Sequence, residues 1–323
     1  MTKDNQNHTV TPITLPMPGL LGSVTLYLLR SHTGITLIDT GMTDKQSTLS
    51  LNRQLKEQGL TIKDIDTVIC THYHVDHVGA AAYFQRHGAK IITSDKTKTS
   101  IKHYFNNPDL DISRAVLYNE HDVPEDFKTS VGETFSYFRE MYSQVTPDST
   151  FKNNSVIHMP GCDLKIIATP GHTEDHVCFY DEQSNIIFLG DHVLAFSAPH
   201  LSLSYENSTK NVLGQYFKSL KKIEDIDDGS TGMSSHGDII KNISLRVKKL
   251  KSFHEHRIER VLNTVTGKPA GCFEIATQIF GLKRQPIANW LASSSTLTYL
   301  EYLEFNKQIK SIKKSGLYSF YKC

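Results

Sequence analysis

The chain has 323 residues, of which 38% are hydrophobic and 21% are charged, and its formal net charge at pH 7 is +1. These values are typical of a globular protein with one large domain or two. They exclude a membrane-spanning protein, because no apolar run approaches the roughly 20 residues that a spanning helix needs. The N-terminal residues lack the apolar segment of a secretory signal, and the five cysteines are scattered. We therefore expect a reduced, cytoplasmic protein without a disulfide framework.

The charge is divided unevenly along the chain. Residues 241–323 contain 15 Lys and Arg against 5 Asp and Glu, whereas residues 1–240 contain 20 against 29. The basic segment could meet an anionic partner, but solvated helix faces around a globular core are the favoured explanation.

The first third of the chain alternates between strands and helices. Residues 1–12 are polar and are expected to be frayed. The patterns that follow predict strands at 24–29 and 34–39, a helix at 44–59, a strand ending at Cys70, a helix at 78–86 and a strand at 89–93. Asp39 closes the second strand. Its carboxylate either caps the next helix or orients a metal-binding histidine.

Residues 95–150 interrupt this alternation and are expected to be helices inserted into the core. Such an insertion is well placed to act as a lid and to line a pocket. Its aromatic residues are Tyr104, Phe105, Tyr118, Phe127, Phe135, Tyr137, Phe138 and Tyr142.

The remaining elements are predicted from the same signals. Strands are expected at 155–159, 163–169, 176–180 and 185–189, helices at 209–223, 240–265, 273–281 and 286–305, and a hairpin at 309–321. His254 and His256 fall inside the long helix and are expected to be packing or surface residues.

The stretch Thr71–Gly79 concentrates metal-binding side chains. It places His72, His74, Asp76 and His77 directly after a predicted buried strand, which is where open α/β sheets place their sites. Three other strand or loop ends deliver His172, Asp191 and His236. Imidazole and carboxylate together suit Zn²⁺, and also iron or manganese. The repetition predicts a metal site.

These motifs, in this order and with the supporting Asp39-Thr-Gly41, resemble the metallo-β-lactamase-fold hydrolase superfamily. The resemblance covers about residues 13–265 and implies an α/β fold, an αββα sandwich with two divalent metal ions at one edge. It assigns one metal to His72, His74 and His172 and the other to Asp76, His77 and His236, with Asp191 as a bridge. Residues 1–265 would form the catalytic domain, and residues 266–323 a small helical, winged-helix-like addition.

Three further residues are candidates for holding the ligands in place, namely Asp39, His176 and His192. Asp76 is also expected to orient or accept a proton during catalysis. Three neutral histidines with an open position activate water, and a second metal can clamp the other reacting oxygen. A hydroxide bridging the two metals would then be the nucleophile.

The helical insertion and the C-terminal addition look most like hydrolases related to glyoxalase II and acyl-thioesterases. The expected small-molecule substrate is therefore an acyl thioester on an anionic carrier, or a related ester. Asp191 stands where true β-lactamases commonly carry cysteine, so a β-lactam is not expected. A lactonase is an alternative, although Leu194 stands where those enzymes usually carry tyrosine. An RNA nuclease or phosphodiesterase is the other alternative, which the basic residues 241–323 favour, but no aromatic–basic nucleic-acid motif is evident.

Overall fold

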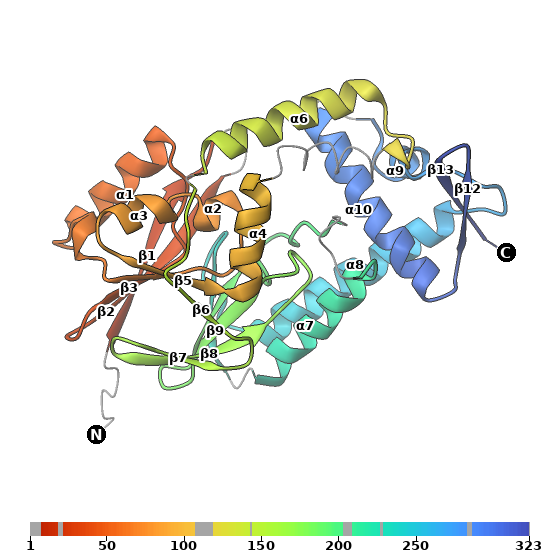
Figure 1. Ribbon diagram of the computed structural model, residues 1–323. Helices are drawn as coiled ribbons and strands as arrows, with labels where there is room; N and C mark the ends of the chain where they lie inside the picture. The colour runs from red at the N-terminus through yellow and green to blue at the C-terminus, as the bar shows by residue number, and fades with distance from the viewer. Residues whose placement is uncertain are drawn as a thin grey trace.

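Two β-sheets packed face to face form the centre of the computed structural model (Figure 1). The structure describes residues 8–18, 22–106, 119–142, 144–202, 209–226, 229–282 and 286–322. The first sheet has the order β1 (His8–Pro16), β2 (Ser23–Ser31), β3 (Ile35–Ile38), β4 (Thr67–Ile69), β5 (Lys90–Ser94) and β6 (Ser149–Phe151). Its first three strands are antiparallel and the rest run parallel. The second sheet has the order β11 (Thr231–Ser234), β10 (Ile186–Gly190), β9 (Val177–Asp181), β8 (Cys162–Ala168) and β7 (Val156–Met159).

Strand β1 corrects the expectation that residues 1–12 are frayed, because residues 8–12 pair with β2 along their whole length. Side chains of β1 alternate between the two faces of the sheet, so that Ile13 and Leu15 face the core while Thr14 faces solvent. The threonines made this segment look polar and obscured the alternation in the sequence. Threonine favours strands despite its polarity. Residues 1–7 lie outside the described part of the chain.

Helices cover the outer faces of both sheets, which gives the predicted αββα layers. On the first sheet lie α1 (Lys45–Glu57), the 3₁₀ turn η1 (Ile62–Asp64), α2 (Val75–Val78) and α3 (Ala81–Arg86). On the second lie α7 (Val212–Ile226) and α8 (Ile243–Thr264). Asp44, not Asp39, caps α1, since its side chain accepts from the amides of Gln46 and Ser47. The range 78–86, expected as one helix, contains the end of α2 and all of α3. The helix is interrupted between them because the Ala80 amide donates to Gly41 O.

The predicted insertion contains α4 (Asp95–Asn106) and α6 (Glu125–Glu140). Helix α4 packs on β5 and β6, and α6 packs on α10 (Pro286–Phe305). Of the aromatic residues expected in the insertion, Tyr118 lies outside the described residues, as do the side chains of Phe105, Phe127 and Phe135.

The C-terminal segment consists of α9 (Cys272–Phe280), α10, β12 (Lys310–Lys314) and β13 (Leu317–Tyr321). The last two strands form the predicted hairpin. One hydrophobic cluster runs from Ile187 in β10 through Leu220 and Leu250 to Leu300 and Phe320. The segment therefore shares a core with the second sheet.

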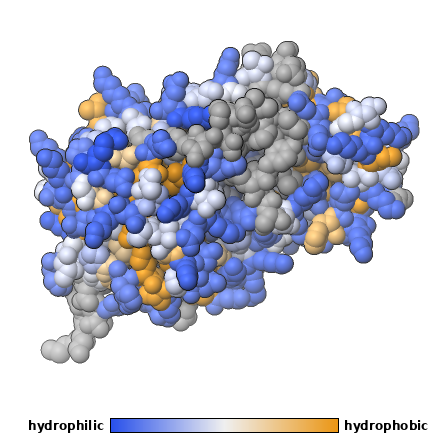
Figure 2. All heavy atoms as spheres, in the orientation of Figure 1, coloured by the Kyte–Doolittle hydropathy of each residue, from blue (hydrophilic) through white to orange (hydrophobic). Residues whose placement is uncertain are grey.

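The exterior seen in Figure 2 is mainly hydrophilic, with smaller apolar areas between polar groups. Among the described residues, no helix has the length and hydropathy to cross a membrane.

Candidate metal centre

The predicted metal ligands meet at one edge of the sandwich, where strands from both sheets end. His72, His74, Asp76 and His77 follow β4 of the first sheet, while His172, Asp191 and His236 follow β8, β10 and β11 of the second. The structure brings all seven together in two groups, whose ligand atoms lie within 4.8 Å of one another in each group. Sheet edges that face each other explain how residues so far apart in sequence converge.

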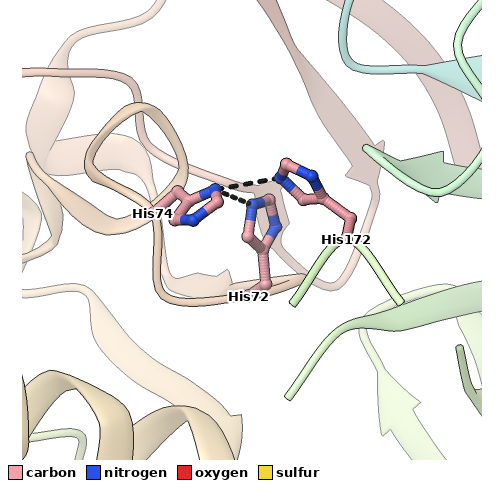
Figure 3. A group of neighbouring side chains, drawn as sticks. All are labelled: His72, His74 and His172. Atoms are coloured by element: carbon pink, nitrogen blue, oxygen red, sulfur yellow. Dashed lines mark hydrogen bonds between the residues drawn. The ribbon is translucent and has the colours of Figure 1, made fainter. Parts of the chain in front are cut away.

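The first group contains three histidines that point toward a common centre (Figure 3). His74 Nδ1 lies 3.1 Å from His72 Nε2 and 2.9 Å from His172 Nε2. The other ring nitrogens of His72 and His172 have oxygen neighbours. His172 Nδ1 donates to the backbone oxygen of His200 at 2.8 Å. His72 Nδ1 lies 3.0 Å from Thr71 Oγ1. These bonds leave the inward nitrogens of His72 and His172 as lone-pair donors.

The second group combines two carboxylates with two histidines. His236 Nε2 lies 3.3 Å from Asp76 Oδ2 and 3.2 Å from Asp191 Oδ1, and His77 Nε2 lies 3.4 Å from each carboxylate. His236 Nδ1 donates to Ser23 O at 2.7 Å. Its inward nitrogen is therefore also available as a ligand.

Asp191 lies between the two groups. Its Oδ2 is 3.3 Å from His172 Nε2 in the first group, while its Oδ1 faces His236 and His77 in the second. One carboxylate thus reaches both groups, which is the geometry that a bridging ligand needs.

The pKa shifts differ between the groups. Burial, together with the neighbouring imidazoles, holds the pKa values of His72, His74 and His172 below the ordinary value, so these rings are neutral. At His236, burial alone would lower the pKa, but the Asp191 and Asp76 carboxylates outweigh burial and raise the pKa to about 11. In return the imidazoles hold the pKa values of both carboxylates down against the effect of burial. Without a metal, protons on His236 and His77 therefore balance the two carboxylates, and a bound cation would take the place of those protons.

The residues present fit two divalent cations. His77 Nε2 and Asp191 Oδ1 are buried and form no hydrogen bond with the described residues. Buried polar atoms without partners are costly, and lone pairs of three imidazoles cannot face one another without a proton or cation between them. Neutral imidazoles with carboxylates suit Zn²⁺ and also accept iron or manganese. Coordination would satisfy the atoms that the protein leaves unpaired.

The three residues expected to hold the ligands in place make different contacts with them. Asp39 Oδ2 accepts from His77 Nδ1 at 2.8 Å, and Asp39 Oδ1 accepts from the Thr71 amide at 2.8 Å. His176 Nε2 accepts from the Asp191 amide at 3.1 Å. The ring of His192 packs on His176 and Tyr216, at centroid distances of 6.0 and 5.1 Å. Asp39 and His176 thus contact candidate ligands directly, whereas His192 packs against His176.

A cavity of about 590 Å³ opens above the two groups. Its floor includes His74, Asp76, Asp191 and His236. The walls are largely apolar or aromatic and come from the turns after β3 and β4, from the insertion and from the loop after β10. They include Met42, Tyr73, Tyr104, Phe138, Tyr142, Leu194 and Phe196.

Several of these wall residues were not predicted from the sequence. Tyr73 sits inside the histidine motif, where alternation with the ligands could have suggested it. Phe196 is 75% exposed at the cavity and gave no periodic signal. His200 was also missed, because it contributes a backbone oxygen that any residue type would provide.

The chain is similar to several known proteins. A relative in Bacillus subtilis (strain 168), named Probable metallo-hydrolase YqjP, is 27% identical over 319 residues, which cover 94% of each chain. Thioesterase pkgB of Emericella nidulans is 26% identical over 235 residues, which cover 73% of this chain and 52% of that protein. The crystal structure of a metallo-beta-lactamase family protein from Thermus thermophilus has the same fold, with a TM-score of 0.86 at 24% identity, covering 97% of this chain and 98% of that one.

The family model of the metallo-beta-lactamase superfamily matches residues 19–229, which include six of the seven candidate ligands and exclude only His236. That match spans more than half of the chain, and the sandwich and the site geometry agree with it. The protein therefore belongs to the metallo-beta-lactamase superfamily.

Proposed function

We propose that this metallo-hydrolase uses two divalent metal ions to cleave an acyl thioester, or a related ester, in the cavity above the two groups. The observation that carries the proposal is the position of Asp191, which reaches both groups on the floor of an apolar cavity. A hydrolytic centre below an apolar wall suits a carbonyl that carries a hydrophobic acyl chain.

The cavity lining supports an acyl group inside and a charged carrier outside. No lysine or arginine is among the described lining residues, while Tyr104, Phe138 and Tyr142 provide aromatic surface. An anionic carrier would therefore remain near the mouth. The similarity to Thioesterase pkgB, of which the chain covers about half, supports the same substrate class.

Divalent cations held by the seven residues would polarise the scissile carbonyl and make water acidic enough to attack it near neutral pH. The Asp76 carboxylate lines the cavity beside His77 and His236, where it would orient the attacking water and take the proton that the water loses. The new C–O bond forms as the C–S bond breaks, and the sulfur leaves with the electron pair. Asp76 returns the proton to this thiolate, so that water and thioester give a carboxylic acid and a thiol.

Thiol release from a series of acyl-coenzyme A and acyl-glutathione thioesters tests the proposal. The metal-loaded protein should turn over at least one of them, and Asp191→Ala should lower the rate by about 10³-fold or more, since it removes a ligand shared by both metals. Asp163→Ala is the matched control, because Asp163 is an exposed residue of β8 away from the site.

Two further substrates separate the alternatives. The same preparations are given single-stranded RNA and a γ-lactone. Absence of thiol release from a chain that holds two metals by elemental analysis would contradict the thioester proposal. Turnover of RNA or lactone that Asp191→Ala abolishes would replace it.

A further inference from the structure

The loop after β10 connects the candidate metal centre to the C-terminal segment. It begins at Asp191 and passes through His200, whose backbone oxygen accepts the hydrogen bond from His172 Nδ1 at 2.8 Å. The orientation of the His172 ring therefore depends on where the His200 peptide lies.

Helix α10 holds that peptide in place through side chains on one of its faces. Ser294 Oγ lies 3.1 Å from His200 Nε2, and Ser295 Oγ lies 3.4 Å from His200 Nδ1. One turn further on, Thr298 Oγ1 donates to Leu201 O at 3.1 Å. The ring of Trp290 lies 5.6 Å from the His200 ring. Residues 290, 294 and 298 recur every four positions, so they form one continuous contact with the loop.

Helix α8 holds a different part of the same loop. Arg246 donates from Nε to Leu194 O at 2.6 Å and from Nη2 to Ser197 O at 2.5 Å. These bonds fix the stretch that lines the cavity. The hydrogen bonds from α10 act at the other end of this stretch, at His200 and Leu201.

We infer that α10 is a positioning element for the metal centre, acting through His200 on His172. The inference rests on the proposed function in treating His172 as a metal ligand. A histidine that donates Nδ1–H to a fixed carbonyl is locked in the tautomer and orientation that present Nε2 to a metal. Without the contacts from α10, the His200 peptide is free to move and His172 loses that lock. This gives the C-terminal segment a role inside the enzyme's own site.

Metal release to a chromophoric chelator tests the inference without any substrate. The double variant Ser294→Ala, Ser295→Ala removes both hydroxyl contacts with the His200 ring and keeps the contact with Trp290. This variant should release one of its two zinc ions at a chelator concentration 10- to 100-fold lower than the concentration that wild type requires. Loss of a hydrogen-bond partner of a metal-binding histidine usually has an effect of this size. Ser293→Ala is the matched control, because Ser293 is a buried serine of the same helix that bonds Asn289 O within that helix. It should release zinc as wild type does.

A pair of substitutions at His200 separates positioning from folding. His200→Gln keeps a side-chain amide that can bond Ser294, whereas His200→Ala keeps none. Weakened zinc binding in His200→Ala that His200→Gln restores would support positioning, even if the serine variant is unstable without metal. Chelator curves of the double variant and of His200→Ala that superimpose on wild type would overturn the inference.

The outcomes for the two proposals are distinct. A wild-type chain that binds two zinc ions but cleaves no thioester would contradict only the proposed substrate. A wild-type chain that binds no metal would overturn both proposals.

Discussion

At the scale of single residues, Asp39 connects the first sheet to the histidine motif. It adopts a left-handed backbone conformation with φ of +64°, which is uncommon outside glycine. This conformation accompanies the contacts of one carboxylate with both the Thr71 amide and the His77 ring. A strained residue at such a position is expected to serve the site next to it.

Asp39→Asn should weaken the metal bound by Asp76, His77 and His236 by about 10- to 100-fold, because the amide removes the charge that supports His77 Nδ1–H. Competition with a chelator measures this loss. Asp44→Asn makes the same chemical change at the cap of α1, where Asn caps as well as Asp, and should bind metal as wild type does. Equal affinities for all three proteins would argue against a role for Asp39 at the site.

His254 gives a pH dependence away from the metal centre. It is 2% exposed, and burial together with the Arg257 guanidinium lowers its pKa from 6.5 to about 4. Between these values the unfolded chain binds a proton that the folded chain does not, so the free energy of unfolding falls as the pH falls from 6.5 toward 4. The contribution to the slope is at most about 1.4 kcal/mol per pH unit.

Urea unfolding at several pH values between 4.5 and 7 measures that slope. His254→Gln should flatten it, since glutamine does not titrate. His256→Gln, at an exposed position of the same helix, should leave it unchanged. If both variants keep the wild-type slope, His254 is not a source of the dependence.

The residues singled out as candidate ligands lie together in the structure, and their assignment as ligands stays a prediction. His72, His74, His172 and Asp191 were recognisable because they follow buried strands and because few other roles suit such clusters. His200 was not, since a backbone oxygen leaves no trace in the choice of side chain. Sequence alone left the role of Asp39 open, and only the contacts show that it faces His77 while Asp44 caps α1.

At the scale of secondary-structure elements, the end of β10 shows why glycine precedes Asp191. Gly190 has φ of +51°, and a Cβ there would lie 2.6 Å from His176 Nε2. His176 Nε2 in turn accepts from the Asp191 amide. The strand can deliver Asp191 to the site only if its last residue leaves room for that ring.

Gly190→Ala should lower the free energy of unfolding by about 2–4 kcal/mol, from the backbone conformation and the clash with His176. Gly229→Ala is the control, because Gly229 has φ of +74° but open space where a Cβ would lie. It should cost only about 1 kcal/mol. Chemical unfolding of the two metal-free variants compares them. Equal losses would show that the contact with His176 is unimportant.

The inserted helices make a separate prediction about substrate choice. Tyr104 of α4 and Phe138 of α6 both line the cavity. Replacing either by alanine should raise KM for a long-chain acyl thioester by about 10-fold and change KM for an acetyl thioester little, because each buried methylene contributes about 0.8 kcal/mol. Tyr137→Ala removes the neighbouring aromatic, which is 49% exposed, and should leave both KM values unchanged. Equal effects on short and long substrates would argue against acyl binding there.

The elements themselves were largely predictable, with informative exceptions. Helical spacing of apolar residues located α8, and α10 and the final hairpin also lie where they were expected. Sequence periodicity missed β1 because threonine is polar yet favours strands. It also could not show that α10 contacts the loop at His200, since that contact joins residues nearly a hundred positions apart.

At the scale of the whole molecule, the candidate ligands join the two sheets. Four come from the first sheet and three from the second, so bound cations would cross-link the halves of the sandwich. Direct bonds between the halves near the site include Thr25 N to Ser235 O and Val177 N to Thr71 O. The metals would strengthen an interface that apolar packing and these hydrogen bonds already hold.

Metal removal should therefore lower the melting temperature of the entire chain. Binding at 1,000 times Kd contributes about 4 kcal/mol, which for a protein of this size corresponds to roughly 5–10 °C. Calorimetry with zinc and with a chelator measures the shift. Asp163→Ala should show the same shift in melting temperature as wild type, and Asp191→Ala should show a much smaller one. A melting temperature that does not respond to zinc in wild type would contradict the cross-link.

The division of the ligands between the sheets has a consequence for the life of the protein in a cell. During synthesis the chain cannot complete its site until His236 has emerged and the second sheet has closed on the first. A molecule made when the cation is scarce keeps two sheets that separate more readily and expose their inner faces to proteases. The supply of metal would then set how long each copy survives, in addition to how fast it works.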